Sequence, residues 1–455
     1  MRIVIAVFLL TATSVISAQS KTGIKAGPML GQVEMRTADI WIEVTPDVKS
    51  VALKYKAINA NIKANGKESG MAIYKGELGK EFNPVKFNIG GLKLNTTYQY
   101  SILINGKGIK IPYETKFTTK DLWQWRKPAP DFSFLTGSCA YFNEPEFDRP
   151  GKPYGGDSSI FETMGKTPAE FMLWLGDNWY TREVDYSSEW GLWYRASRDR
   201  SLPVLQKLLS SMSHYSIWDD HDYGPNDIGG SYILKNESRN VFKNYWDNPS
   251  YGEDGKGVYS NFSYSDVDIF LTDDRFFRST DDMPDSVNSE PNREKEYFGK
   301  KQLQWLKNAL LYSKATFKII ATGSQVLNPV SKFECMKAYP AEYYELMNFL
   351  DKQNIKGVLF FTGDRHHSEV IKMERPGNYA LYDVTSSPLT SGIGRVQGLE
   401  KDNPVRIRGT LVEEQNFTRV TVSGKKGERK MNVEFLGIKG NKLAEWSVTE
   451  KELQK

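Results

Sequence analysis

The sequence has few cysteines, few histidines and no long apolar run. Two cysteines among 455 residues exclude a disulfide-rich scaffold. No stretch approaches the ~20 consecutive apolar residues that cross a bilayer, so we expect no transmembrane helix. The net charge of +4 is too small at this length to indicate a nucleic-acid partner or a membrane surface. The sequence contains no internal repeat and no low-complexity tract. Its composition is that of an ordinary soluble globular protein. We expect a monomer.

The first 18 residues have the pattern of a secretory signal peptide. Arg2 precedes an apolar run from Ile3 to Leu10, and small residues follow as far as Ala18. We expect cleavage after Ala18 and a mature protein that lies in the periplasm or outside the cell. The first 18 residues contain no arginine pair, which favours export of the unfolded chain. No cysteine follows it, so we expect no lipid anchor.

The character of the sequence changes near residue 120. Residues 19–120 consist of short alternating apolar and polar segments with turn residues between them. This pattern predicts a small all-β sandwich of fibronectin or immunoglobulin type. Residues 121–131 contain two prolines and are expected to form a linker. Residues 132–455 are expected to form a second, larger domain.

Apolar strands alternate with helical segments in this larger domain. The helical periodicity is clearest at 301–312 and 341–350. Together they predict an α/β fold in which helices cover both faces of a sheet. The expected strands lie at 132–135, 171–175, 215–218, 267–271, 317–321 and 358–361, and final strands at 417–422, 431–435 and 443–448 are expected to extend the sheet edge.

Each of the six buried strands is followed by residues that can bind metal ions or phosphate. In α/β sheets, ligands bind beyond the carboxyl ends of the strands. The residues there are Cys139, Asp177 with Tyr180, Asp219 to Asp222 with Asn226, Asp273 to Arg275, Gln325, and Asp364 to His367. A single residue of this kind is usually a helix cap or a satisfied core group, but six in succession are not explained in that way. Several carboxylates that converge on one sheet edge need cations between them, so the pattern predicts a metal centre.

The two cysteines differ in their surroundings. Cys139 follows a strand directly, where a metal ligand or a nucleophile is expected, and Cys335 has no such context. An exported protein can contain a disulfide, but we expect Cys139 to act as a thiolate ligand and Cys335 to be incidental. Ser138 has no histidine placed by local sequence to activate it, so we expect no serine nucleophile.

The order of these motifs resembles that of the alkaline phosphatase D (PhoD-like) family of metallophosphoesterases, and purple acid phosphatases are more distantly similar. The resemblance covers nearly the whole mature chain and implies an α+β sandwich of metallophosphoesterase type preceded by a small β-sandwich. The motifs that carry it are Cys139, Gly-Asp-x-x-Tyr at 176–180, Trp-Asp-Asp-His-Asp at 218–222, Gly-Asp-x-His at 363–366 and Ser-Ser-Pro-Leu-Thr-Ser-Gly at 386–392.

The resemblance also implies two kinds of metal ion. The implied Fe³⁺ ligands are Cys139, Asp177, Tyr180 and His366, and those of one or two Ca²⁺ ions are Asp177, Asp220, Asn226 and Asp364. A thiolate and a phenolate stabilise Fe³⁺, whereas an oxygen-only set suits Ca²⁺. Gln325 lies where the purple acid phosphatases place a histidine, which favours calcium over zinc or copper.

A secreted alkaline phosphatase follows from this resemblance. A shared carboxylate would hold two metals that clamp the attacking and leaving oxygens, with a metal-bound hydroxide as the nucleophile. His221 would contact phosphate or protonate the leaving oxygen, and Arg275 would hold a phosphate oxygen. We expect hydrolysis of phosphate monoesters with some diesterase activity. The substrate would be a small molecule or a cell-envelope polymer.

Two alternatives stay open at this point. The motifs do not fix the number of ester substituents, so a phosphodiesterase of phospholipase D-like or teichoate-directed type on the same site stays an alternative. The tryptophans and tyrosines between residues 179 and 223 would either wall a cleft for a bulky leaving group or form the core of a helical excursion. A glycan-binding surface module with a degenerate site is disfavoured, because every motif keeps its ligand-type residue.

Overall fold

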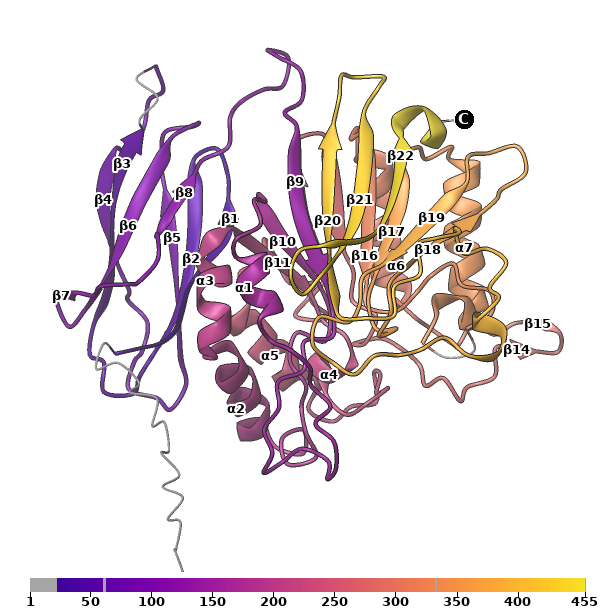
Figure 1. The fold of residues 1–455 in the computed structure, drawn as a ribbon, viewed down its shortest axis with the longest axis horizontal. Coiled ribbons are helices and arrows are strands. Elements are labelled where there is room, and N and C mark those ends of the chain that lie inside the picture. Colours follow the sequence, from indigo (N-terminus) through magenta and orange to yellow (C-terminus); the bar gives the residue numbers. More distant parts are fainter. Residues whose placement is uncertain (1–22, 60–62, 332–333, 455) are drawn as a thin grey trace, which may run out of the picture.

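The computed structural model describes residues 23–59, 63–331 and 334–454 (Figure 1). The predicted signal peptide, residues 1–18, lies outside the described residues. Within the described residues, no helix combines the length and the apolar character needed to cross a membrane.

The N-terminal part of the chain is built from strands. Their alternating buried and exposed residues, clearest in β6, form one apolar core between two layers. These strands are β1 (Ile24–Val33), β2 (Thr37–Val44), β3 (Val51–Asn59), β4 (Ser69–Ile73), β5 (Asn83–Gly90), β6 (Thr97–Ile104), β7 (Lys107–Gly108) and β8 (Lys116–Thr118). The segment 121–131 that follows contains no helix or strand. The division into domains at this segment, and the fibronectin or immunoglobulin type of the first one, stay predictions.

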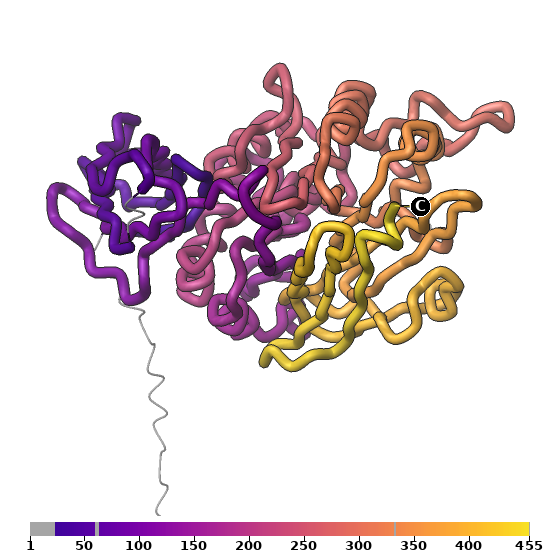
Figure 2. Tube along the Cα trace, turned by 90° about the horizontal axis from the view of Figure 1, so that it is seen from above, coloured from indigo at the N-terminus to yellow at the C-terminus, as the bar shows by residue number. Residues whose placement is uncertain are grey.

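The first large sheet joins strands from both halves of the chain. Its order is β22-β21-β20-β9-β10-β11-β1-β2-β5, so three N-terminal strands continue the sheet beyond β11, where Leu30 is bridged to Ser213. Figure 2 shows the indigo N-terminal strands at one end of the molecule. The other strands of this sheet are β9 (Phe132–Gly137), β10 (Phe171–Leu175), β11 (Ser213–Ile217), β20 (Asn416–Ser423), β21 (Lys430–Gly437) and β22 (Lys442–Thr449). The final three strands extend the sheet beside β9, as predicted.

The second large sheet has the order β12-β13-β16-β17-β19-β18. Strands β13, β16, β17 and β19 are parallel, like β9 to β11 in the first sheet. Its strands are β12 (Ser260–Tyr264), β13 (Val267–Leu271), β16 (Phe317–Thr322), β17 (Val358–Thr362), β18 (Glu369–Met373) and β19 (Leu381–Thr385), and a separate short hairpin pairs β14 (Ser286–Val287) with β15 (Glu290–Pro291).

The two large sheets pack face to face, with helices outside them. The ring centroid of Phe134 lies 4.8 Å from that of Phe171 in the same sheet and 6.0 Å from that of Phe361 in the other. Met172 and Trp174 point the opposite way and form a second core with the outer helices. The helices on that side are α1 (Ile160–Met164), α2 (Glu189–Arg200), α3 (Pro203–Ser211) and α5 (Lys235–Tyr245), and those packed with the second sheet are α6 (Lys300–Tyr312) and α7 (Pro340–Lys352).

This layering corrects one expectation. Helices do not cover both faces of a single sheet; each sheet has helices on its outer face and the other sheet on its inner face. A strand that is apolar on both faces predicts burial on both sides, but it does not tell whether the covering layer is a helix or another sheet.

Candidate metal centre

The strands of both sheets end at a common edge, and glycines let the strand ends approach each other there. A Cβ atom at Gly363 would lie 2.5 Å from the carbonyl oxygen of Leu175, and one at Gly176 would lie 2.6 Å from the Cβ of Asp219. Such contacts are too close for any side chain. The glycines that precede Asp177 and Asp364 therefore hold β10, β11 and β17 close enough for their terminal carboxylates to meet.

Four of the predicted ligands have an unusual backbone conformation. Cys139, Asp177, Asp364 and His366 have φ angles of 61°, 51°, 65° and 56°. This left-handed region is uncommon for residues other than glycine, and strained residues of this kind cluster at functional sites. The left-handed conformation of these residues turns the chain sharply just after each strand ends.

The first donor cluster contains sulfur, nitrogen and oxygen. Ligand atoms of Cys139, Asp177 and His366 all lie within 4.8 Å of one another. The Tyr180 hydroxyl donates a 2.8 Å hydrogen bond to Oδ2 of Asp177 and lies 3.3 Å from Nε2 of His366. Nδ1 of His366 lies 3.0 Å from the Tyr154 hydroxyl, which orients the imidazole toward the cluster.

Burial makes the first cluster unfavourable for free anions. It raises the pKa of the Cys139 thiol to about 11 and that of Tyr180 well above its usual value. A thiolate and a phenolate in this place therefore need a cation beside them. Thiolate, phenolate, imidazole and carboxylate together fit a ferric ion.

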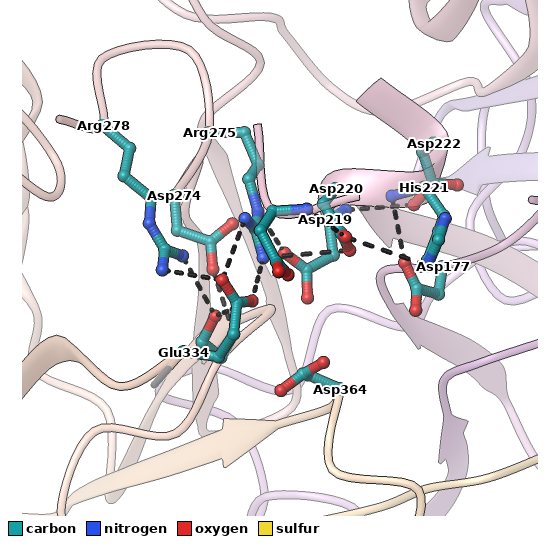
Figure 3. A network of polar contacts seen from close by, with 12 residues as sticks. Asp177, Asp219, Asp220, His221, Asp222, Asp274, Arg275, Arg278, Glu334 and Asp364 are labelled. Carbon is teal, nitrogen blue, oxygen red and sulfur yellow. Dashed lines mark hydrogen bonds and ion pairs between the residues drawn. The ribbon is translucent and has the colours of Figure 1, made fainter. Parts of the chain in front are cut away.

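The second donor cluster shares Asp177 with the first and is rich in oxygen. Asp177, Asp220 and His221 form one group of close ligand atoms, and Asp219, Glu334 and Asp364 form another. All of these residues except Asp219 line a cavity of about 330 Å³, whose wall also includes Asn226. Figure 3 shows Asp364 facing the other carboxylates across open space.

The second cluster also requires positive charge. Burial and the neighbouring Asp220 raise the pKa of Asp177 well above the usual range. Burial, aided by the charge of Glu334, raises the pKa of Asp364 to about 7. Oδ2 of Asp219 is buried and has no hydrogen-bond partner among the described residues, and no interaction joins Asp364 to the residues drawn in Figure 3. An oxygen-rich set of this kind fits a calcium ion.

The position of Arg275 differs from the expectation. Its guanidinium is wholly buried, and it forms ion pairs with Asp219 and Glu334 instead of facing the cavity (Figure 3). The buried carboxylates around it hold its pKa well above the usual value against the effect of burial. Arg275 therefore lies behind the carboxylates in this structure, and its contact with a phosphate oxygen stays a prediction. Arg365 and Arg395 line the cavity instead.

Sequence reasoning missed Glu334 and Tyr154. Glu334 lies in the long loop after β16, ten residues from Ser324, to which it is hydrogen-bonded. Tyr154 lies in the loop between β9 and α1. Neither residue follows a strand end directly, so the pattern that located the other residues could not locate these two.

Several of the aromatic residues between 179 and 223 belong to the core, whereas Trp190 is 52% exposed and Tyr180 and Tyr186 line a cavity. Trp179 and Trp218 are buried with the outer helices, and Trp193 packs against Phe82. Of the four arginines in this segment, Arg182 lines a cavity, and Arg195 and Arg200 are buried. The core interpretation therefore holds for these tryptophans. The two cysteines are both free and buried, so no disulfide joins them.

Comparison with known proteins places this geometry in a family. The family model described as PhoD-like phosphatase matches residues 134–434. Alkaline phosphatase D from Bacillus subtilis (strain 168) is 28% identical over an alignment of 127 residues, with 24% of this chain and 21% of that protein covered. The match therefore spans about a fifth of that relative's length.

Two solved structures show the same fold at low identity. A structure of PhoD has a TM-score of 0.73 at 18% identity, with 95% of this chain and 91% of that chain covered. Purple acid phosphatase PPD1 from yellow lupin (Lupinus luteus) seeds has a TM-score of 0.64 at 10% identity, with 94% and 75% covered. The chain therefore has the mixed α/β, sheet-rich fold of these phosphatases.

Proposed function

Because this chain belongs to the PhoD-like phosphatase family and is a phosphoric ester hydrolase, we propose that it is an exported alkaline phosphatase that cleaves phosphate monoesters and, more slowly, diesters. The observation that carries this proposal is the position of Asp177. Its carboxylate belongs both to the sulfur-containing cluster with Cys139 and to the oxygen-rich cluster with Asp220. One carboxylate between two different donor sets is the arrangement that a two-metal phosphoesterase needs.

We further propose which residues hold each ion. Cys139, Asp177, Tyr180 and His366 would hold Fe³⁺, and Asp177, Asp220, Asn226 and Asp364 would hold Ca²⁺. Glu334 faces the same cavity and adds a carboxylate that sequence reasoning did not include. Bound there, the ions would supply the positive charge that attracts the phosphate oxygens and promotes attack by water.

The chain's own residues would position the ester and its protons. His221 lines the cavity, and its Nε2 lies 3.8 Å from Oδ2 of Asp220. Its Nδ1 forms no hydrogen bond with the described residues. A histidine at the cavity wall can donate a proton to the leaving oxygen or a hydrogen bond to phosphate. Arg395 is exposed at the same wall and forms no ion pair with a described residue, so it can contact an outer phosphate oxygen.

The proposed iron site predicts a coloured protein. Element analysis of the purified protein should find iron and calcium, and a Tyr180 phenolate on Fe³⁺ should absorb visible light. Tyr180→Phe should abolish this band, because the phenolate oxygen is removed. Tyr141→Phe is the matched control, because the ring of Tyr141 lies 5.0 Å from that of Tyr180 but its hydroxyl is hydrogen-bonded to Asp148. A band that persists in Tyr180→Phe, or a protein without iron, would contradict the assignment.

The preference for monoesters is tested with a pair of substrates. A monoester dianion carries one more negative charge than a diester, and two cations with Arg395 would neutralise it. We therefore expect kcat/KM for para-nitrophenyl phosphate to exceed that for bis(para-nitrophenyl) phosphate. A bis-ester value tenfold or more above the monoester value, about 1.4 kcal/mol in transition-state binding, would instead establish the phosphodiesterase of phospholipase D-like or teichoate-directed type.

A further inference from the structure

A second cavity adjoins the one that contains the carboxylates. It has a volume of about 480 Å³, and Tyr154, His221 and Asn226 line both cavities. We call it the tyrosine cavity, because the aromatic residues of its wall are Tyr141, Phe147, Tyr154, Tyr180 and Tyr186. The two cavities therefore meet at His221, the residue proposed to face the leaving oxygen.

Part of the aromatic wall is held rigidly. The ring of Tyr141 packs edge-on against those of Tyr154 and Tyr180, with centroids 4.9 and 5.0 Å away. The guanidinium of Arg182 lies 4.0 Å from the centre of the Tyr141 ring, and the Tyr141 hydroxyl donates a 2.7 Å hydrogen bond to Asp148. A preorganised wall of rings loses little conformational entropy when a ligand binds to it.

Two rings of the wall are partly exposed to solvent. Phe147 and Tyr186 are only half-buried. Rings that are partly open to solvent gain most from stacking, because a flat ligand ring removes their remaining exposed apolar surface from water. The tyrosine cavity thus offers both a rigid wall and two rings that a ligand can cover.

The charged side chains that line the tyrosine cavity indicate what charge its ligand carries. Arg182 is ion-paired with Asp148 at 3.0 Å, and Arg149 with Glu183 at 3.4 Å. Lys152 also lines the cavity and forms no ion pair with a described residue. Aromatic walls can bind quaternary ammonium groups, but the excess of positive charge here opposes a cation. The charges favour a neutral or anionic ring.

We propose that the tyrosine cavity binds the leaving group and selects esters whose alcohol carries a flat aromatic or heteroaromatic ring, as a nucleoside does. This inference rests on the proposed function, since His221 at the junction would face the leaving oxygen while the phosphate lies among the carboxylates. The alcohol then extends into the cavity on the other side of His221. Stacking of a base on aromatic side chains changes binding by about tenfold or more.

Two substrates that differ only in the ring test the inference. Adenosine 5′-monophosphate and ribose 5-phosphate share a primary 5′ leaving oxygen, so their intrinsic reactivities are similar. In the metal-loaded wild-type protein, kcat/KM should be about tenfold or more higher for the nucleotide. Phe147→Ala should bring this ratio below about threefold. Tyr312→Ala, which removes an 87% exposed tyrosine from α6, should leave the ratio unchanged.

The outcomes separate the inference from the proposed function. Equal kcat/KM values in the wild type, or a ratio that Phe147→Ala does not change, would overturn the tyrosine cavity as the binding site of the ring. Tyr186→Leu provides the same test if Phe147→Ala does not fold. If neither ester is hydrolysed, the proposed function fails, and calorimetry with adenosine still decides the inference. Binding that is weakened about tenfold in Phe147→Ala supports it, and no binding overturns it.

Discussion

Replacing His221 with alanine is expected to lower kcat by roughly 10²- to 10⁴-fold while the proposed iron and calcium ions stay bound. The ring lies 4.1 Å from that of Tyr180 and borders both cavities, so it is close to the proposed ligands and also open to the substrate. Burial lowers the pKa of His221, against the effect of Asp220. A negatively charged ester beside the ring would raise that pKa again and favour proton transfer to the leaving oxygen.

His221→Gln distinguishes the two roles that His221 could have. Glutamine can still donate a hydrogen bond to a phosphate oxygen, but it cannot transfer a proton at ordinary pH. If proton donation is the main role, both variants should lose activity to a similar extent. Recovery of most activity in His221→Gln would indicate a phosphate contact instead. Loss of metal from His221→Ala, measured by element analysis, would show that His221 is itself a ligand.

Arg275→Ala should have the largest effect on stability. Arg275 is fully buried and is ion-paired with Asp219 and Glu334, both of which are themselves buried. Removing one partner of a buried ion pair leaves uncompensated charge and costs about 3–5 kcal/mol. The free energy of unfolding from urea denaturation of the metal-loaded protein should fall by about this amount.

A surface ion pair provides the control for Arg275→Ala. Lys301 is paired with Asp254, and both side chains are more than half exposed. Exposed ion pairs are screened by solvent and contribute little to stability, so Lys301→Ala should be nearly neutral. If Arg275→Ala loses activity with unchanged stability, the arginine contacts substrate, as the sequence predicts.

The ligand residues at the strand ends could be predicted because the topology of a parallel sheet places the carboxyl ends of its strands together. Parallel strands place their carboxyl ends at one edge of a sheet, which brings Cys139 and Asp177 together in the first sheet. Asp364 follows a strand of the second sheet, and it joins them because the two sheets pack face to face. The left-handed φ angles at these residues follow from the same geometry. The residue types then indicated the chemistry, because few functions need a cysteine, a tyrosine and several carboxylates at one edge.

Contacts made by loops could not be predicted in this way. Glu334 and Tyr154 reach the site through long loops with no periodic pattern. The burial of Arg275 was also hidden, because an arginine after a strand looks the same in sequence whether it faces solvent or a neighbouring carboxylate. The pairing of β1 with β11 depends on a contact between residues 183 positions apart, Leu30 and Ser213, and local sequence carries no signal of it.

Because β1 pairs with β11, the N-terminal strands β1, β2 and β5 belong to the first large sheet. Side chains reinforce it: the indole nitrogen of Trp41 donates a hydrogen bond to the carbonyl oxygen of Asn244, and buried Glu43 accepts one from Ser197. A chain lacking these strands would leave β11 as an unprotected edge, open to pairing with another molecule. The bridge to Leu30 lies at Ser213, the first residue of β11, whereas Asp220 and His221 follow the other end of the strand. The N-terminal strands therefore cover this edge of β11 as well as extending the first large sheet.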